Sequence, residues 1–114
     1  MTLNLIITKN NTIIGENIVL ADTFWLRLAG LIPKKNLQQG EGLLIRPCRQ
    51  IHTWFMSFPI DVIFLNKGNQ IVHLIPEMKP RKLSPFIKQG LQVLELPSAS
   101  ITVHELKIGD KLVF

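Results

Sequence analysis

The stretch from Cys48 to Asp61 brings together a thiol, an imidazole, an indole and a carboxylate. Cys48 and His52 are four positions apart and could form a dyad in which the imidazole generates a nucleophilic thiolate. In an extended strand, however, two such positions lie roughly 13 Å apart, so a dyad requires a bend near residues 49–50. A lone cysteine often serves as a small apolar side chain, and we favour that interpretation of Cys48.

A second interpretation of the same stretch is a recognition surface. If residues 48 to 56 are extended, alternation places Gln50, His52, Trp54 and Met56 on one face together with Cys48. The indole of Trp54 could then stack on a sugar or another planar ring while His52 and Gln50 bind its edge. These four residues and Asp61 are the ligand-binding candidates. The structural alternative is that Trp54 and Met56 fill a layer of the core.

Asp61 lies within the apolar run Pro-Ile-Asp-Val-Ile-Phe-Leu, which would partly bury its carboxylate. A buried carboxylate needs a cation or backbone N–H donors, and Arg46, Arg49 and His52 are the nearest candidates. A structural role would have Asp61 accept backbone N–H bonds and hold the turn at Pro59. A functional role would make His52 and Asp61 an acid–base pair, and these two are the catalytic candidates.

Neither a metal site nor a cofactor site is predicted. A metal needs three or four ligands, and Cys48, His52, His73 and His104 could supply them only if three distant segments converged. The Gly109-Asp110 turn is not part of a phosphate-binding loop, because neither a glycine-rich run nor a Lys-Ser/Thr pair follows it. We therefore expect no metal and no cofactor.

The elements that must position these residues are mostly short strands. Segments rich in Ile, Val, Leu, Phe and Thr alternate with turn residues along the chain. The expected strands are 3–8, 12–20, 43–46, 51–58, 60–65, 70–75, 91–96 and 111–114. One helix is expected, which Asp22 or Thr23 caps and Gly30 ends. Residues 98–106 fit either a short helix capped by Ser98 or a strand, and both possibilities stay open.

Turn residues separate these strands. Asn10-Asn11 is typical of a tight hairpin, because asparagine tolerates positive φ angles, and Gly15 indicates a bulge in the second strand. Residues 40–42 are expected to form a turn, as are residues 66–69, with Gly68 in the left-handed region. The three prolines between residues 76 and 89 predict a long irregular excursion.

This pattern predicts that residues 1–114 form a single domain of the mainly β class, with a compact sandwich-like or barrel-like fold. We expect seven or eight short strands and one or two short helices. Hydrophobic residues make up 46% of the chain and charged residues 18%, which favours a packed core over disorder.

Composition also narrows the classes of function. The net charge of +5 is not concentrated in a run of like charges, and without a nucleic-acid-binding motif we consider nucleic acid an unlikely partner. The single cysteine excludes an intrachain disulfide. The chain has no apolar stretch of roughly 20 residues that would span a membrane and no pattern typical of a signal peptide. These features predict a cytoplasmic protein, and the oligomeric state stays open.

A long central pattern closely resembles domain-of-unknown-function family 192. The pattern comprises Gly40-Glu-Gly-Leu-Leu-Ile-Arg-Pro-Cys48 and Ile51-His-Thr-Trp-Phe-Met-Ser-Phe-Pro-Ile-Asp-Val-Ile-Phe-Leu65, with further similarity at Gly30-Leu31, Gly68, Leu94-Glu-Leu-Pro97 and Gly109-Asp110. The resemblance covers nearly the whole chain after residue 20. It implies a compact β domain and brings no established activity, cofactor or catalytic residue.

Three functions are compatible with these residues. The leading hypothesis is a non-enzymatic small-ligand-binding or accessory domain that uses the face containing His52, Trp54 and Asp61. The first alternative is a hydrolase-like or isomerase-like enzyme with His52 and Asp61 as its acid–base pair. The second is a protein–protein interaction module that docks through exposed sheet edges or the basic loop from Lys79 to Lys88.

Overall fold

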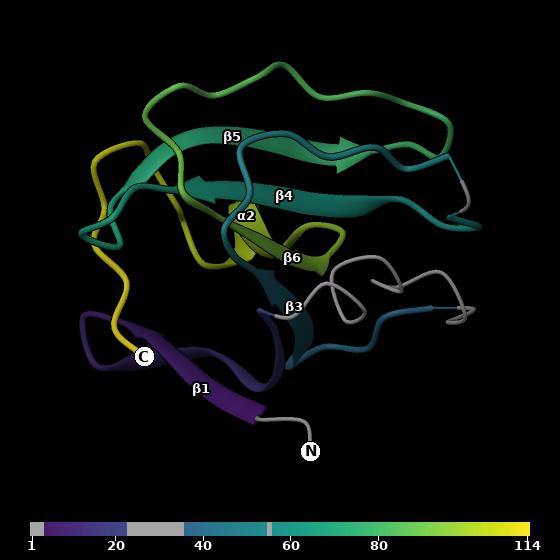
Figure 1. Cartoon of the computed structure of the whole chain (residues 1–114). Helices are drawn as coiled ribbons and strands as arrows, with labels where there is room; N and C mark the ends of the chain where they lie inside the picture. Colours follow the sequence, from purple (N-terminus) through teal and green to yellow (C-terminus); the bar gives the residue numbers. More distant parts are fainter. Residues whose placement is uncertain (1–3, 23–35, 55) are drawn as a thin grey trace.

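The computed structural model describes residues 4–22, 36–54 and 56–114, and within them six strands form one mixed sheet (Figure 1). The strands follow the order β1-β2-β3-β6-β4-β5, with only β2 and β3 parallel among the paired strands. Their bounds are β1 Asn4–Lys9, β2 Thr12–Ala21, β3 Glu41–Ile45, β4 Ile60–Leu65, β5 Ile71–Met78 and β6 Gln92–Pro97, and a short helix α2 spans Ser100–Val103.

The mainly β class is confirmed. The described residues contain six strands rather than seven or eight, and these belong to a single open sheet rather than to two stacked sheets. The helix expected from Asp22 or Thr23 to Gly30 lies outside the described residues. For residues 98–106 the helical alternative holds, since α2 occupies part of this segment, but its N-cap residue is Ala99 rather than Ser98, and no side chain caps it.

The first hairpin is confirmed. Lys9 pairs with Thr12, and both turn residues have positive φ angles, 51° at Asn10 and 64° at Asn11. The register shifts on either side of Ile7, whose partner is Gly15. A Cβ atom at Gly15 would lie 2.5 Å from Cδ1 of Ile18, so glycine permits the close approach that this irregularity creates.

The turn expected at residues 40–42 is only partly right. Gly40 has a φ of 88° and forms the turn, whereas Gly42 already belongs to β3. A Cβ atom at Gly42 would lie 2.6 Å from the carbonyl oxygen of Glu95 on β6. Glycine is therefore needed at position 42 for close packing rather than for turn geometry.

Two expected strands are not strands. The described residues of 51–58, all but residue 55, contribute only an isolated bridge between His52 and Leu83, and the segment expected at 111–114 contributes isolated bridges at Lys111 and Val113. The partner of the first segment is the loop 79–90, whose Pro80 and Pro85 have no backbone N–H to donate. A continuous ladder cannot form there, although the residue types in 51–58 favour strands.

β5 extends further than expected and contains a bulge. It continues through Pro76 to Met78, which is compatible with its place at the edge of the sheet. Its register with β4 shifts by one residue at this point, and Glu77 has a φ of 49°. In the turn before β5, the left-handed residue is Asn69, with a φ of 65°, and not Gly68.

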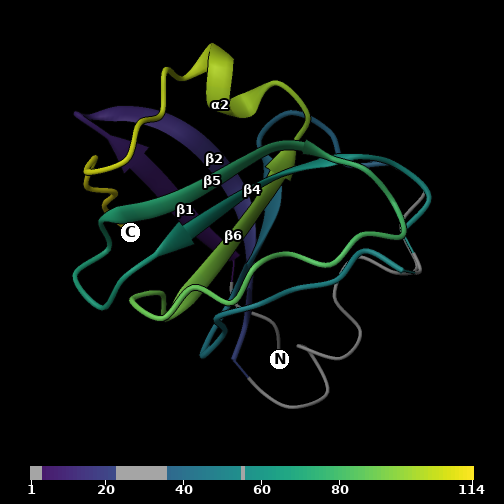
Figure 2. The same cartoon turned by 90° about the horizontal axis from the view of Figure 1, so that it is seen from above.

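The sheet carries a hydrophobic cluster on each face. One cluster, which includes Leu44, Ile63 and Leu94, packs against Ile101 of α2 and the C-terminal segment, and we call this the helix-side face. The other includes Val62, Phe64 and Val93 and packs against residues of the loops 46–58 and 79–90; we call this the loop-side face. Figure 2 shows α2 and the two loops on opposite sides of the sheet. In the described residues, no helix is long and apolar enough to cross a membrane.

Glu95 is an acidic residue at the centre of this sheet. It pairs with Leu43 of β3 and Val62 of β4, alternates with Val93 on the loop-side face, and is only 6% exposed. Loss of hydration raises the pKa of its carboxyl from the ordinary value of 4.5 to about 7. The unfolded chain therefore ionises Glu95 at a lower pH than the folded chain does.

This difference predicts a pH-dependent stability that Glu95→Gln removes. The contribution of protonated Glu95 is fully present below about pH 4.5 and is lost as the pH rises through about 7. We expect the Gln variant to gain up to about 3 kcal/mol in free energy of unfolding over the wild type at about pH 8, and much less at about pH 5. Urea unfolding of both proteins at both pH values measures this difference in stability. A difference between the Gln variant and the wild type that is the same at both pH values would contradict the raised pKa of Glu95.

Candidate functional site

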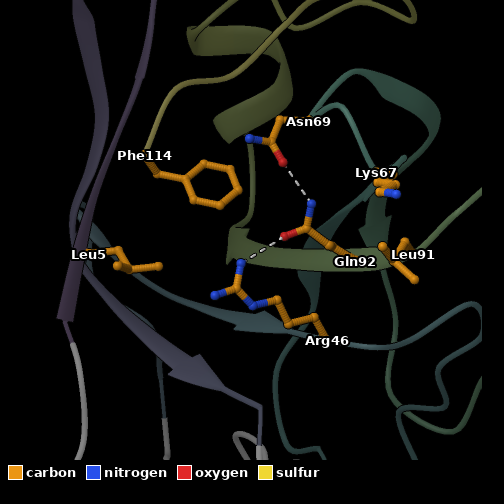
Figure 3. A pocket seen from close by; sticks show the side chains of 7 residues that line it. All are labelled: Leu5, Arg46, Lys67, Asn69, Leu91, Gln92 and Phe114. Carbon is orange, nitrogen blue, oxygen red and sulfur yellow. Dashed lines mark hydrogen bonds between the residues drawn. The ribbon is translucent and has the colours of Figure 1, made fainter.

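A pocket of about 400 Å³ opens where β3, β6, the β4–β5 turn, β1 and the C-terminal segment meet (Figure 3). Its polar lining residues are Arg46, Lys67, Asn69 and Gln92, and its apolar ones are Leu5, Leu91 and Phe114. The lining contains two cationic side chains and no acidic one. The volume falls at the lower end of the range of small-molecule sites.

The strand register explains why Arg46 and Gln92 meet. Ile45 of β3 pairs with Val93 of β6 in antiparallel fashion, so the next residue of one strand faces the preceding residue of the other. Arg46 is additionally fixed by its backbone N–H, which donates to the carbonyl oxygen of Ala21 at 3.1 Å. The result is a contact of 3.5 Å between Nη1 of Arg46 and Oε1 of Gln92.

Asn69 comes from the tight turn between β4 and β5. Oδ1 of Asn66 accepts the backbone N–H groups of Gly68 and Gln70, each at 2.9 Å, which shapes the turn. The backbone oxygen of Asn69 accepts the N–H of Leu112 at 2.9 Å, so the C-terminal segment helps to hold this residue. Its side-chain Oδ1 then accepts a hydrogen bond from Nε2 of Gln92 at 2.8 Å.

The hydrogen bonds from Arg46 through Gln92 to Asn69 form a chain that determines the orientation of both side-chain amides. A guanidinium group only donates hydrogen bonds, so Gln92 must present Oε1 to Arg46 and Nε2 to Asn69. Asn69 therefore presents its oxygen to Gln92, which leaves its Nδ2 group as the donor on the other side of the amide. Gln92 is itself only 3% exposed, and it positions two donor groups beside the pocket. Figure 3 shows this chain along one side and the Phe114 ring and Leu5 on the other.

Of the residues predicted from the sequence, Gln50, His52, Trp54 and Met56 lie elsewhere, in the segment that covers the loop-side face. Ile51 and Thr53 are buried, whereas His52 and Trp54 are exposed, so the expected alternation holds locally. Trp54 does not fill the core, since 53% of it is accessible. The Gln50 amide donates to the carbonyl oxygen of Ser84 at 2.9 Å and fastens this segment to the loop 79–90.

Two further residues of that segment pack toward the sheet. Met56 and Cys48 are half-buried against the loop-side cluster, so Met56 follows the core-filling alternative. The thiol of Cys48 donates to the carbonyl oxygen of Gln50 at 3.3 Å. In residues 4–22, 36–54 and 56–114, no group of three or more His, Cys, Asp or Glu side chains is placed to hold a metal ion. His73 lies edge-on to Phe64 instead, with ring centroids 5.6 Å apart.

Asp61 is fully buried and bonded to the backbone. Oδ1 accepts the N–H of Glu77 and Oδ2 the N–H of Ile101, both at 2.8 Å. Glu77 belongs to the bulge of β5, and Ile101 to the first turn of α2. The expected partners were backbone N–H groups at the turn of Pro59; the observed ones are backbone N–H groups of two other segments.

The structure does not bring His52 and Asp61 together. Ile60 and Val62 belong to the loop-side cluster, so Asp61 between them points to the helix-side face. The segment containing His52 covers the loop-side face, with Ile51 in its cluster. The sheet thus separates the two members of the predicted acid–base pair, and Asp61 from Trp54 as well.

The pocket residues were missed by the sequence analysis for a clear reason. In the sequence, Arg46 is a nearby cation for Asp61, and Asn69 and Gln92 are residues of an expected turn and an expected strand. The one local signal was Gln92, a polar residue within an expected strand of otherwise largely apolar character. Its meaning depends on register and on the position of the C-terminal segment, which the sequence does not reveal.

Removal of the Asp61 carboxylate should destabilise the protein. In Asp61→Ala two buried backbone N–H groups lose their acceptor, and we expect a loss of about 2–4 kcal/mol in the free energy of unfolding. Asp61→Asn should lose less, because its remaining oxygen still accepts one bond. The control is Glu16→Ala, which changes an exposed carboxylate on β2. Urea titration measures all three, and an Asp61→Ala variant as stable as Glu16→Ala would contradict the structural role.

Comparison with known proteins identifies the family to which this sequence is similar. The family model DUF192, described as an uncharacterized ACR, matches residues 5–114. A UPF0127 protein of Thermococcus kodakarensis is 33% identical over 95 residues, covering 80% of this chain, and the chain spans only 60% of that protein. A UPF0127 protein of Pyrococcus furiosus is 31% identical over 109 residues, covering 93% of this chain and 92% of that protein.

Two solved structures share the fold. A protein of unknown function from Novosphingobium aromaticivorans superposes with a TM-score of 0.84 at 20% identity, covering 99% of this chain and 85% of that chain. A protein from Sinorhizobium meliloti has a TM-score of 0.73 at 20% identity, covering 84% and 79%. The family match over residues 5–114 shows that this chain belongs to domain-of-unknown-function family 192, whose members are uncharacterised.

Proposed function

We propose that this domain binds a small anionic molecule, a carboxylate or phosphate ester with an apolar or planar part, in the pocket between Arg46 and Phe114. The observation that carries the proposal is the hydrogen-bonded chain from Arg46 through Gln92 to Asn69, which positions donors at a pocket without acidic residues. The proposal retains the small-ligand-binding function expected from the sequence and moves it to a different set of residues.

The electrostatics of the pocket support an anionic ligand. Arg46 is half-buried, and charge-assisted hydrogen bonds from a guanidinium to a carboxylate or phosphate are roughly twice as strong as neutral ones. Lys67, an exposed residue of the β4–β5 turn, adds a second positive charge. An amine or other cation would find no acidic side chain in this lining, which favours a ligand of negative charge.

The apolar wall supports a ligand that is more than a bare ion. Phe114 and Leu5 are half-buried, and their side chains lie on the side of the pocket opposite Gln92 (Figure 3). A ring or short alkyl chain of the ligand would displace water from these surfaces, which contributes roughly 25 cal/mol per Å² of apolar area. No group in the pocket is assigned a catalytic role, and the proposed function is binding. The predicted cytoplasmic location stays a prediction.

The test compares matched probes that differ in charge. We expect benzoate and phenyl phosphate to raise the melting temperature and to bind in calorimetric titration, and benzamide and benzylamine to bind at least about tenfold more weakly. Equal affinity for the charged and the neutral probes would overturn the proposal.

Two variants locate the binding to this pocket. Gln92→Glu places a carboxylate against the Arg46 guanidinium and should weaken benzoate binding by at least about tenfold, because the guanidinium is already neutralised. Arg46→Met should have a similar effect, whereas Arg49→Met, an exposed arginine outside the pocket lining, should bind as the wild type does. Wild-type affinity in both pocket variants would place the ligand elsewhere and refute the assignment.

A further inference from the structure

The positive charge of this protein is concentrated on the loop-side cover. Residues 48–54 and 79–90, which we call the cationic ribbon, contain Arg49, Lys79, Arg81, Lys82 and Lys88 and no acidic residue. The other eight Lys and Arg residues of the chain are matched by its eight Asp and Glu residues. The formal net charge of +5 is therefore that of the ribbon alone.

The two segments of the ribbon are held side by side by backbone hydrogen bonds. The N–H of Thr53 donates to the carbonyl oxygen of Lys82 at 2.9 Å, and the N–H of Arg81 donates to that of Thr53 at 2.8 Å. The N–H of Ser84 donates to the carbonyl oxygen of Ile51 at 2.9 Å. These bonds hold side by side two segments that are some 30 positions apart in sequence, the green loop and the teal segment of Figure 2.

The ribbon separates its buried side chains from its exposed ones. Ile51, Thr53 and Ser84 are buried toward the sheet. Trp54, Leu83 and Phe86 are 53%, 62% and 63% exposed, and all three belong to these two paired segments. The surface therefore combines three solvent-exposed apolar groups with five cations.

An apolar groove adjoins this surface. It has a volume of about 430 Å³ and runs between β5 and the loop 79–90, with Ile75, Met78, Leu83 and Pro85 in its lining. Lys79 and Lys82, two exposed cations of the ribbon, also line it. The lining also includes His73 and the exposed carboxylate of Glu77, so its Lys and Glu side chains together carry one excess positive charge beside the apolar wall.

We propose that the cationic ribbon docks this protein onto the surface of an anionic phospholipid bilayer. Lys and Arg side chains near a membrane surface attract acidic headgroups, and Trp, Phe and Leu side chains enter the interfacial layer. Both kinds of side chain occur on the ribbon. Binding of single-stranded nucleic acid would account for fewer of these features. Bases stack on planar groups and would not contact Leu83, or the groove lined by Ile75 and Met78, to a comparable extent.

The test is flotation with vesicles of two compositions. The full chain should float with phosphatidylcholine vesicles that contain about one third phosphatidylglycerol, should not float with phosphatidylcholine alone, and should dissociate as salt is added. Equal flotation with both compositions, or none with the anionic vesicles at low salt, would overturn the proposal. Capture of an oligothymidylate without vesicle binding would overturn it equally.

Matched variants assign the binding to the ribbon. Lys82→Glu should weaken vesicle binding about tenfold, whereas Lys111→Glu, an exposed lysine at the other end of β5, should not. The double variant Trp54→Ser with Leu83→Ser should lose at least about tenfold in affinity. Its control is Ile108→Ser, since Ile108 is 66% exposed and lies outside the ribbon.

All changed residues are exposed, and thermal unfolding of each variant verifies that it is folded. If the apolar double variant is unfolded, Lys82→Glu and Lys111→Glu still decide the matter. Equal binding by these two would refute the ribbon assignment. The benzoate titration is independent of this result, because neither Lys82 nor Trp54 lines the pocket of Arg46.

Discussion

The central strands of the sheet are buried on both faces, and this constraint determines how the rest of the chain is used. Every residue of β4 is buried, and only Pro97 of β6 is not. Each face must therefore be covered, by α2 and the C-terminal segment on one side and by two long loops on the other. Three residues of these strands have polar side chains that are buried, and each is stabilised in a different way. Asp61 accepts hydrogen bonds from backbone N–H groups, Gln92 bonds to Arg46 and Asn69, and burial raises the pKa of Glu95, which favours its neutral form.

The C-terminal segment connects the two edges of the sheet and so creates the pocket. Asp110 accepts the N–H of Ile71 at the edge strand β5, and Val113 exchanges two hydrogen bonds with Thr8 at the edge strand β1. The sheet is not closed by a strand, yet its two edges are tied together through this segment. Phe114 and Leu5 thereby reach the pocket that Arg46 and Gln92 line from the sheet. The barrel-like character expected from the sequence corresponds to this link rather than to a continuous ladder.

Sequence patterns were sufficient where local chemistry decides the structure. The asparagine turn at residues 10–11 and the apolar runs of β4 and β6 follow from local preferences, and the structure contains them. The segment 51–58 was expected to be a strand because its residues favour one, but its partner loop contains prolines and supplies no regular ladder. The expected pairing of His52 with Asp61 required knowing which face each one occupies. A shift of one residue in the alternation places a side chain on the opposite face of the sheet. The sequence spacing between His52 and Asp61, which spans Pro59, does not determine which face each residue occupies.

The two outer edges of the sheet are protected differently from its faces. An uncovered edge strand offers a row of N–H and C=O groups to any second chain, and this is how sheets polymerise. Here Asp110 occupies one end of β5, and Pro76 with the bulge at Glu77 disrupts the other. Val113 pairs in the same way with Thr8, near the C-terminal end of β1. These contacts and the bulge interrupt the regular ladder near the ends of both edge strands, which shortens the stretch of backbone that a neighbouring molecule could extend.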